Sequence, residues 1–210
     1  MRGHPVLPIR HLAKDSRLAY GLRMESILDA PSARQATYQL SVEHYHQLNE
    51  IGVLRNDVEL LDGYLIKKMP KSPLHTFICQ WLVEALRRFI PAGFVIRQEQ
   101  PLTTASSEPE PDLSVVRGAS TDYRERHPTT AEFAIEVAVN TEEIDLRKAA
   151  LYAEAGVKEY WVVDPRTKRI TVFRSPQGRG YEQSTVFEGA QTVACAALPG
   201  FKVSLPALFA

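Results

Sequence analysis

The fold follows from segment 133–164, whose sequence is FAIEVAVNTEEIDLRKAALYAEAGVKEYWVVD. Its first residues alternate between large and small side chains, as in a strand with two distinct faces. The large face contains Phe133, Ile135 and Val137, and the small face contains Ala134, Glu136 and Ala138. Because both faces are almost entirely apolar, this strand is predicted to be buried and central. A helix is predicted over 142–155, closed by Gly156, and a second buried strand over 160–163.

The predicted helix has an inward stripe that contains a lysine. At about 100° per residue, this stripe comprises Ile144, Lys148, Leu151, Tyr152 and Ala155. Asn140 or Thr141 is the expected N-cap. A buried ammonium is costly unless it snorkels to an edge or contacts carboxylates. Both placements of Lys148 remain open at this point: it extends past the end of the sheet, or it contacts acidic side chains.

The remaining patterns predict one α/β domain around a mixed sheet over residues 37–210, with an irregular N-terminal extension over 1–36. The turn signal Asp62-Gly63 indicates a hairpin, and Ser72-Pro73 begins a helix that ends before Gly93. Other elements are predicted as a helix over 42–50, strands over 94–99, 113–116, 169–174 and 181–187, and a short strand near 201.

Composition excludes several classes of protein. The 210 residues have a formal net charge of zero, and no uncharged apolar run approaches the roughly 18 residues of a membrane helix. No membrane association is expected, and nucleic-acid contacts would have to come from local lysines such as those in 67–71. The two cysteines, Cys79 and Cys195, are far apart and lack a CxxC pattern, so neither a zinc site nor a disulfide is predicted. A reducing cytoplasm fits this usage.

Two acidic residues at strand positions and one inward lysine indicate a chemical site. Asp112 follows Pro111 at a strand start, and Glu136 lies between two alanines on a buried strand. Each residue alone is also compatible with a structural ion pair or a backbone-capping role. Together with Lys148, they point to hydrolysis at phosphorus assisted by Mg²⁺ or Mn²⁺, because carboxylate oxygens suit these hard cations.

These residues carry a resemblance to a known family. The motif PD at 111–112, then Glu136 and a nearby lysine, resembles the PD-(D/E)XK nuclease superfamily. The wider pattern is similar to a bacterial family labelled "putative restriction endonuclease", long carried as a domain of unknown function. The quoted segments are VELLDG (58–63), SPLH (72–75), PDLSVV (111–116), IEVA (135–138), DLRK (145–148) and YAEAGVKEYWVVD (152–164).

The resemblance implies a restriction-endonuclease-like core in which Asp112 and Glu136 bind the metal. It also implies DNA as substrate, with RNA as a further possibility, and a homodimer. The superfamily has lysine two residues after its glutamate, where this chain has Ala138. Because Ala138 shares a strand face with Glu136, Lys148 is expected to extend its ammonium into the space that the alanine leaves.

Glu59 and His75 match family positions, and the resemblance makes them auxiliary catalytic groups. Each is equally compatible with a surface or capping role. Asp145, one turn before Lys148, is expected either to hold that lysine or to be a surface charge. The sequence therefore predicts a cytoplasmic, metal-dependent DNA endonuclease with Asp112, Glu136 and Lys148 at its centre. Two alternatives stay open: an inactive nuclease-fold protein that binds DNA or assembles with a partner, and a phosphodiesterase acting on RNA or a small substrate.

Overall fold

The computed structural model describes residues 26–55 and 57–210. The chain divides into two compact units, residues 1–37 and residues 38–210. Residues 1–25 of the predicted irregular extension lie outside the described residues. Beyond that point it contains a 3-10 turn, η1 (Ile27–Asp29), and a short helix, α1 (Pro31–Gln35). The irregular prediction is therefore wrong for these few residues, because Pro31 occupies the first helical position, where its fixed φ favours a helix start.

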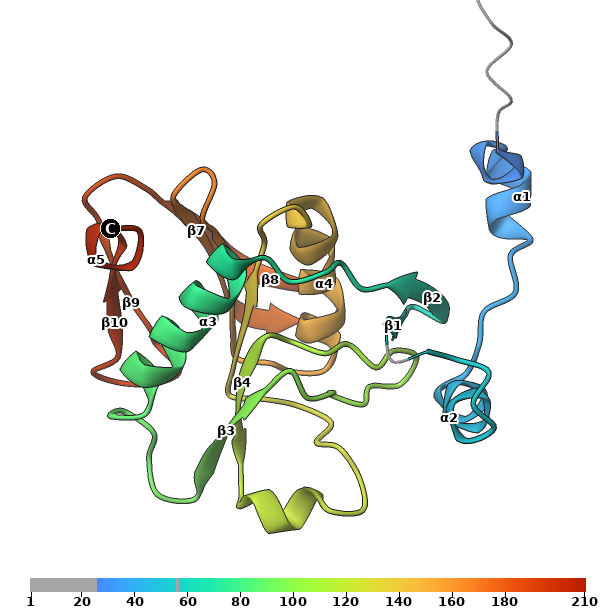
Figure 1. Cartoon of the computed structure of the whole chain (residues 1–210), viewed down its shortest axis with the longest axis horizontal. Helices are drawn as coiled ribbons and strands as arrows, with labels where there is room; N and C mark the ends of the chain where they lie inside the picture. Colours follow the sequence, from blue (N-terminus) through green and yellow to red (C-terminus); the bar gives the residue numbers. More distant parts are fainter. Residues whose placement is uncertain (1–25, 56) are drawn as a thin grey trace, which may run out of the picture. The chain divides into compact units, whose positions relative to one another are not determined.

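A six-stranded mixed sheet forms the centre of the second unit, as predicted (Figure 1). Its strand order is β3-β4-β5-β6-β7-β8. The strands are β3 (Phe94–Gln98), β4 (Leu113–Arg117), β5 (Phe133–Val137), β6 (Glu159–Asp164), β7 (Arg169–Gln177) and β8 (Gly180–Phe187). Only the β5–β6 pair is parallel, and the helix between these strands makes that connection.

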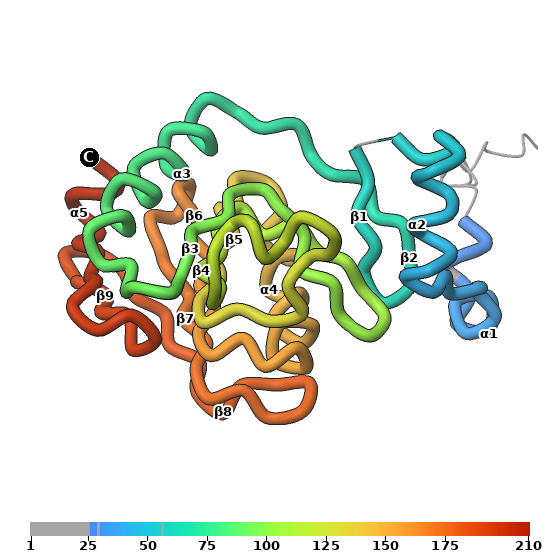
Figure 2. Tube along the Cα trace, turned by 90° about the horizontal axis from the view of Figure 1, so that it is seen from below, coloured from blue at the N-terminus to red at the C-terminus, as the bar shows by residue number. Residues whose placement is uncertain are grey.

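Helices cover both faces of the sheet. Helix α3 (Pro73–Leu86) packs on the large face of β5, and α4 (Glu142–Glu154) packs on the small face (Figure 2). The alternation predicted from the sequence is confirmed, since Ile135 belongs to the apolar cluster with α3 and Ala134 to the cluster with α4. Ile135 and Ala134 are both 0% exposed, so β5 is buried on both of its faces. Glu136 therefore lies on a central, buried strand.

A separate hairpin, β1 (Val58–Leu61) and β2 (Tyr64–Lys67), follows helix α2 (Val42–Glu50). Its turn residues Asp62 and Gly63 both have positive φ, 49° and 79°, as a two-residue primed turn requires. A Cβ on Gly63 would lie 2.7 Å from the Cβ of Gln39, so no other residue fits there. The hairpin joins the main body through a bridge between Leu60 and Glu108.

The C-terminal region contains more structure than the sequence predicted. Short strands β9 (Thr192–Ala194) and β10 (Lys202–Ser204) pair with each other, and α5 (Leu205–Leu208) follows. A 3-10 turn, η2 (Ser120–Tyr123), was also missed. The short strand predicted near 201 corresponds to β10, whereas β9, α5 and η2 are too short for periodicity to detect. Phe201 and Val203 pack in the apolar cluster on the α3 side of the sheet.

Glu159 anchors this C-terminal region to the sheet. Its side chain is 1% exposed and accepts hydrogen bonds from the indole of Trp161 (2.7 Å) and the guanidinium of Arg174 (2.9 Å). It also accepts from the backbone amides of Ala196 (2.7 Å) and Ala197 (3.0 Å). One buried carboxylate therefore satisfies donors from β6, β7 and the segment after β9.

We expect Glu159→Ala to lower the free energy of unfolding by about 3 kcal/mol, because it leaves several buried donors without an acceptor. Urea denaturation followed by circular dichroism measures this change. The matched control is Glu188→Ala, which breaks an exposed pair with Arg169 and is expected to cost less than about 1 kcal/mol. Equal losses in the two variants would contradict the anchoring role.

Candidate active site

A groove of about 550 Å³ brings together all five site residues predicted from the sequence. Its walls come from the β1–β2 hairpin, the loop before α3, the start of α3, the segment before β4, the end of β5 and the first turns of α4. The five residues are Glu59, His75, Asp112, Glu136 and Lys148, and each is at most 9% exposed. They are separated by up to 89 positions in sequence, so the fold creates this convergence.

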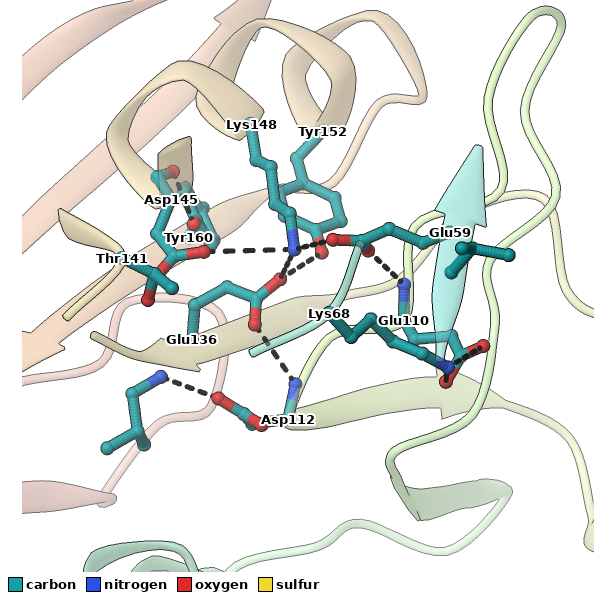
Figure 3. A network of polar contacts seen from close by, with 12 residues as sticks. Glu59, Lys68, Glu110, Asp112, Glu136, Thr141, Asp145, Lys148, Tyr152 and Tyr160 are labelled. Atoms are coloured by element: carbon teal, nitrogen blue, oxygen red, sulfur yellow. Dashed lines mark hydrogen bonds and ion pairs between the residues drawn. The ribbon is translucent and has the colours of Figure 1, made fainter. Parts of the chain in front are cut away.

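Lys148 occupies the centre of the acidic cluster (Figure 3). Its ammonium lies 2.9 Å from Glu59, 3.0 Å from Glu136 and 3.7 Å from Asp145. Burial alone lowers the pKa of this ammonium, but the neighbouring carboxylates, led by Glu136, outweigh burial and raise the pKa above its ordinary value. Lys148 is therefore a charged, inward-facing residue, and it does not snorkel past the sheet.

Glu136 is the most strongly desolvated acid of the groove. Its Oε1 accepts hydrogen bonds from Lys148 (3.0 Å) and from the Tyr152 hydroxyl (2.8 Å). Burial raises the pKa of this carboxyl well above its ordinary value, and Lys148 opposes that shift. A second positive charge near Glu136 would therefore stabilise its ionised form.

The carboxylates of Asp112 and Glu136 each accept a hydrogen bond from the backbone of the segment that carries the other. The backbone amide of Asp112 donates to Glu136 Oε2 (3.3 Å), and the backbone amide of Val137 donates to Asp112 Oδ2 (2.7 Å). The remaining oxygen of Asp112, Oδ1, lies 3.0 Å from Nε2 of His75. Because β4 and β5 are adjacent antiparallel strands, this reciprocal arrangement fixes both carboxylates beside one another.

The expected contact between Lys148 and both acids holds only in part. Among the ion pairs of the described residues, none joins Lys148 to Asp112. The second carboxylate on the ammonium is Glu59, whose other oxygen accepts from the backbone amide of Glu110 (3.2 Å). Glu59 is thus a buried member of the cluster rather than a surface residue of the hairpin.

Asp145 is also buried, which removes its interpretation as a surface charge. It contacts Lys148 across one helical turn, and the hydroxyl of Thr141 donates to its Oδ2. Thr141 is the N-cap residue of α4, but its side chain binds Asp145 and does not cap the helix. Burial raises the pKa of the Asp145 carboxyl. Ile144, expected in the inward stripe, is 40% exposed at the groove wall.

A protein-family model described as "Putative restriction endonuclease", Uma2, matches residues 42–206. The chain belongs to the Uma2 family. The resemblance noted from the sequence is therefore confirmed, and family membership supports a nuclease function in general terms.

A solved structure has the same fold as this Uma2 family member. It is described as a putative nuclease belonging to DUF820 from Anabaena variabilis, with 19% sequence identity and a TM-score of 0.63. The match covers 77% of this chain and 96% of that chain. A comparison with curated proteins finds no match. None of the helices in the described part of the chain combines the length and apolar composition needed to cross a bilayer.

The groove has the charge balance of a divalent-cation site. Four buried carboxylates, those of Glu59, Asp112, Glu136 and Asp145, face the ammonium of Lys148 and the imidazole of His75. The four carboxyl groups are in excess of the two basic groups, and burial raises the pKa of Glu136 and Asp145, so a cation bound there would stabilise their ionised forms. Oxygen ligands and this excess suit Mg²⁺ or Mn²⁺.

Two features of this Uma2 site were missed from the sequence. The Tyr152 hydroxyl donates to Glu136, and four-residue spacing from Lys148 on α4 was the available signal. The second is Cys79, which follows His75 by one helical turn. Among the described residues, the one group of three side chains with metal-ligating atoms all within 4.8 Å is His75, Cys79 and Asp112. No zinc site was predicted from the sequence, because the third side chain, Asp112, is brought to His75 and Cys79 only by the fold.

Proposed function

We propose that this chain is a metal-dependent endonuclease that hydrolyses phosphodiester bonds in DNA. The observation that carries the proposal is a buried lysine ammonium held between Glu59 and Glu136 in an open groove, with Glu136 hydrogen-bonded in turn to the backbone amide of Asp112. A buried lysine that is paired with several carboxylates in a cleft marks a candidate functional site. The family description and the PD-(D/E)XK-like motif point to the same chemistry.

Asp112 and Glu136 would hold Mg²⁺ or Mn²⁺. When bound, the ion supplies a lowered pKa for a coordinated water and neutralises charge on the phosphate. The protein's own contribution is orientation. Hydrogen bonds from the amides of Asp112 and Val137 orient the two carboxylates, which limits the freedom that they would lose on binding a cation.

Lys148 would position the nucleophilic water. An ammonium has three N–H donors. Two are engaged by Glu59 and Glu136, while the nearest oxygen of Asp145, at 3.7 Å, lies beyond hydrogen-bond distance. One donor is thus available for a water or a phosphate oxygen. Tyr152 and Glu59 act as positioning residues, because they fix the groups around this donor.

Lysines on the groove wall would contact the DNA backbone. Lys67, Lys68 and Lys71 all line the groove, and the side chain of Lys67 is 77% exposed. The acidic floor repels phosphate, so cationic groups at the rim are needed to hold the strand. Lys68 and Lys71 also form ion pairs with Glu110 and Glu99, which keep them at the wall.

We expect Lys67→Ala to weaken DNA binding and to reduce the slope of log affinity against log salt by about 0.9, the value for one lost phosphate contact. Fluorescence anisotropy at several salt concentrations measures both. Lys202→Ala, on β10 and away from the groove, is the control and should leave the slope unchanged. An unchanged slope for Lys67→Ala would show that the DNA backbone does not contact Lys67.

A cleavage assay tests the proposal directly. Supercoiled plasmid incubated with the purified chain should be nicked or linearised with Mg²⁺ or Mn²⁺ and remain intact with a chelator. A homodimer, expected from the resemblance, would place two grooves on two strands, so the fraction of linear product should rise with protein concentration. Salt-dependent binding without cleavage in any divalent metal would favour the inactive nuclease-fold alternative. A parallel RNA substrate measures the preference between nucleic acids.

A further inference from the structure

His75 and Asp112, which line the groove, form with the buried Cys79 a second set of metal-ligating atoms, whose chemistry differs from that of the carboxylate set. His75 and Cys79 lie one turn apart on the same face of α3, and Asp112 meets His75 from the start of β4. All three side chains are buried, with 9%, 2% and 8% exposure. We propose that His75, Cys79 and Asp112 form a binding site for Zn²⁺ or another thiophilic divalent cation.

The spacing of the three ligand atoms is close to that of a zinc tetrahedron. With bond lengths of about 2.0–2.3 Å, two ligands of tetrahedral zinc are separated by roughly 3.3–3.8 Å. Cys79 Sγ lies 3.7 Å from Nδ1 and 3.9 Å from Nε2 of His75, and Nε2 lies 3.0 Å from Asp112 Oδ1. The remaining separation is at most 4.8 Å. Zinc binding would therefore need a closure of at most about 1 Å at that edge and a lengthening of about 0.3 Å between Nε2 and Oδ1.

The nature of the ligands selects the metal. A sulfur, a nitrogen and a carboxylate oxygen suit Zn²⁺, whereas Mg²⁺ takes oxygen ligands. Asp112 is already oriented, since its Oδ2 accepts from Val137 and leaves Oδ1 toward α3. His75 and Asp112 line the groove, so a water from the groove can take the fourth position. Binding releases the thiol proton of Cys79 to solvent and forms the sulfur–zinc bond.

Zinc at this site would regulate the nuclease, a consequence that rests on the proposed function. Asp112 belongs to both ligand sets, and zinc would occupy its free oxygen, Oδ1, on the side of α3. A chain loaded with zinc therefore loses one of the two carboxylates that hold the hydrolytic cation. Low concentrations of Zn²⁺ should lower Mg²⁺-supported cleavage by about tenfold or more.

Cobalt spectroscopy tests the site without any cleavage assay. Co²⁺ added to the metal-free full chain should produce a thiolate-to-cobalt charge-transfer band, which Zn²⁺ then displaces. The chain has only two cysteines, and both are buried and free, so Cys195→Ser is a matched control. The band should persist in Cys195→Ser and disappear in Cys79→Ser, whose zinc affinity should fall on the order of 100-fold.

Each outcome bears on the proposal. Absence of the band in the unmodified chain, or its loss in Cys195→Ser, would overturn the site. The Cys195→Ser spectrum is decisive even if Cys79→Ser does not fold, because any remaining thiolate band must come from Cys79. A band without cleavage in any metal would uphold the zinc site and refute the nuclease proposal. Inhibition by Zn²⁺ that is equal in folded Cys79→Ser and in the unmodified chain would reject the regulatory role.

Discussion

Lys148→Met should reduce the single-turnover rate of DNA cleavage by about 10²–10⁴-fold, with little change in DNA affinity. Methionine keeps the length and apolar stem of lysine but has no donor for the attacking water. The loss therefore falls on the chemical step. Quenched time courses at saturating protein measure the rate, and anisotropy with catalytically silent Ca²⁺ measures binding.

The same variant should also be less stable, by about 3 kcal/mol, because Glu59 and Glu136 lose their buried counter-charge. The expected loss of stability agrees with the raised pKa of the Lys148 ammonium. A raised pKa in the folded state means that the charged form of this lysine stabilises the fold at neutral pH. Arg147→Met is the matched control on the opposite face of α4. Its guanidinium is 78% exposed and pairs with Glu143, so its loss should affect neither rate nor stability strongly.

Moving the lysine from position 148 to position 138 tests whether cleavage requires the ammonium itself or the residue at position 148. Ala138 is 1% exposed and shares the strand face of Glu136, at the position where the PD-(D/E)XK pattern has lysine. The double variant Ala138→Lys/Lys148→Ala should recover cleavage relative to Lys148→Ala, since a strand lysine brings an ammonium to the same carboxylate. Full activity of Lys148→Met would remove this lysine from the mechanism.

The sequence predicted the parts of this site that depend on local periodicity. Alternation along β5 placed Glu136 on the face toward α4, and helical spacing placed Lys148 toward the sheet. Both predictions need only the direction of side chains within one element. Their meeting at 3.0 Å follows because the connection β5–α4–β6 packs the helix back onto the strand that precedes it.

Contacts between distant segments were beyond the reach of periodicity. Glu59 meets Lys148 because a hairpin 89 positions away is fixed against the loop before β4, through the amide of Glu110 and the bridge to Glu108. No local pattern encodes that register. Cys79 shows the same limit: its spacing from His75 was visible in the sequence, but the third ligand came from a different element.

Glu136→Gln and Asp112→Asn should each lower metal-supported cleavage by at least about 10³-fold, because each removes a negatively charged ligand from the hydrolytic cation. Both amides keep the shape of the acid. Titration of Mn²⁺ binding by calorimetry should show weakened affinity in parallel with the lost rate. Glu143→Gln, an exposed acid on α4, is the control and should match the unmodified chain.

The stability of Glu136→Gln distinguishes a functional acid from a structural one. Burial raises the pKa of Glu136, so its ionised form opposes folding at neutral pH even though Lys148 is nearby. A neutral isostere removes that cost but weakens the pair with Lys148, and its NH2 group cannot accept the hydrogen bond from the Asp112 amide. Together these effects should leave the free energy of unfolding within about 1 kcal/mol of the unmodified chain. Urea denaturation measures it. A large loss of stability together with unchanged cleavage would make Glu136 a structural partner of Lys148. Lost cleavage in a chain of unchanged stability is the result expected for an acid that binds the metal and does not stabilise the fold.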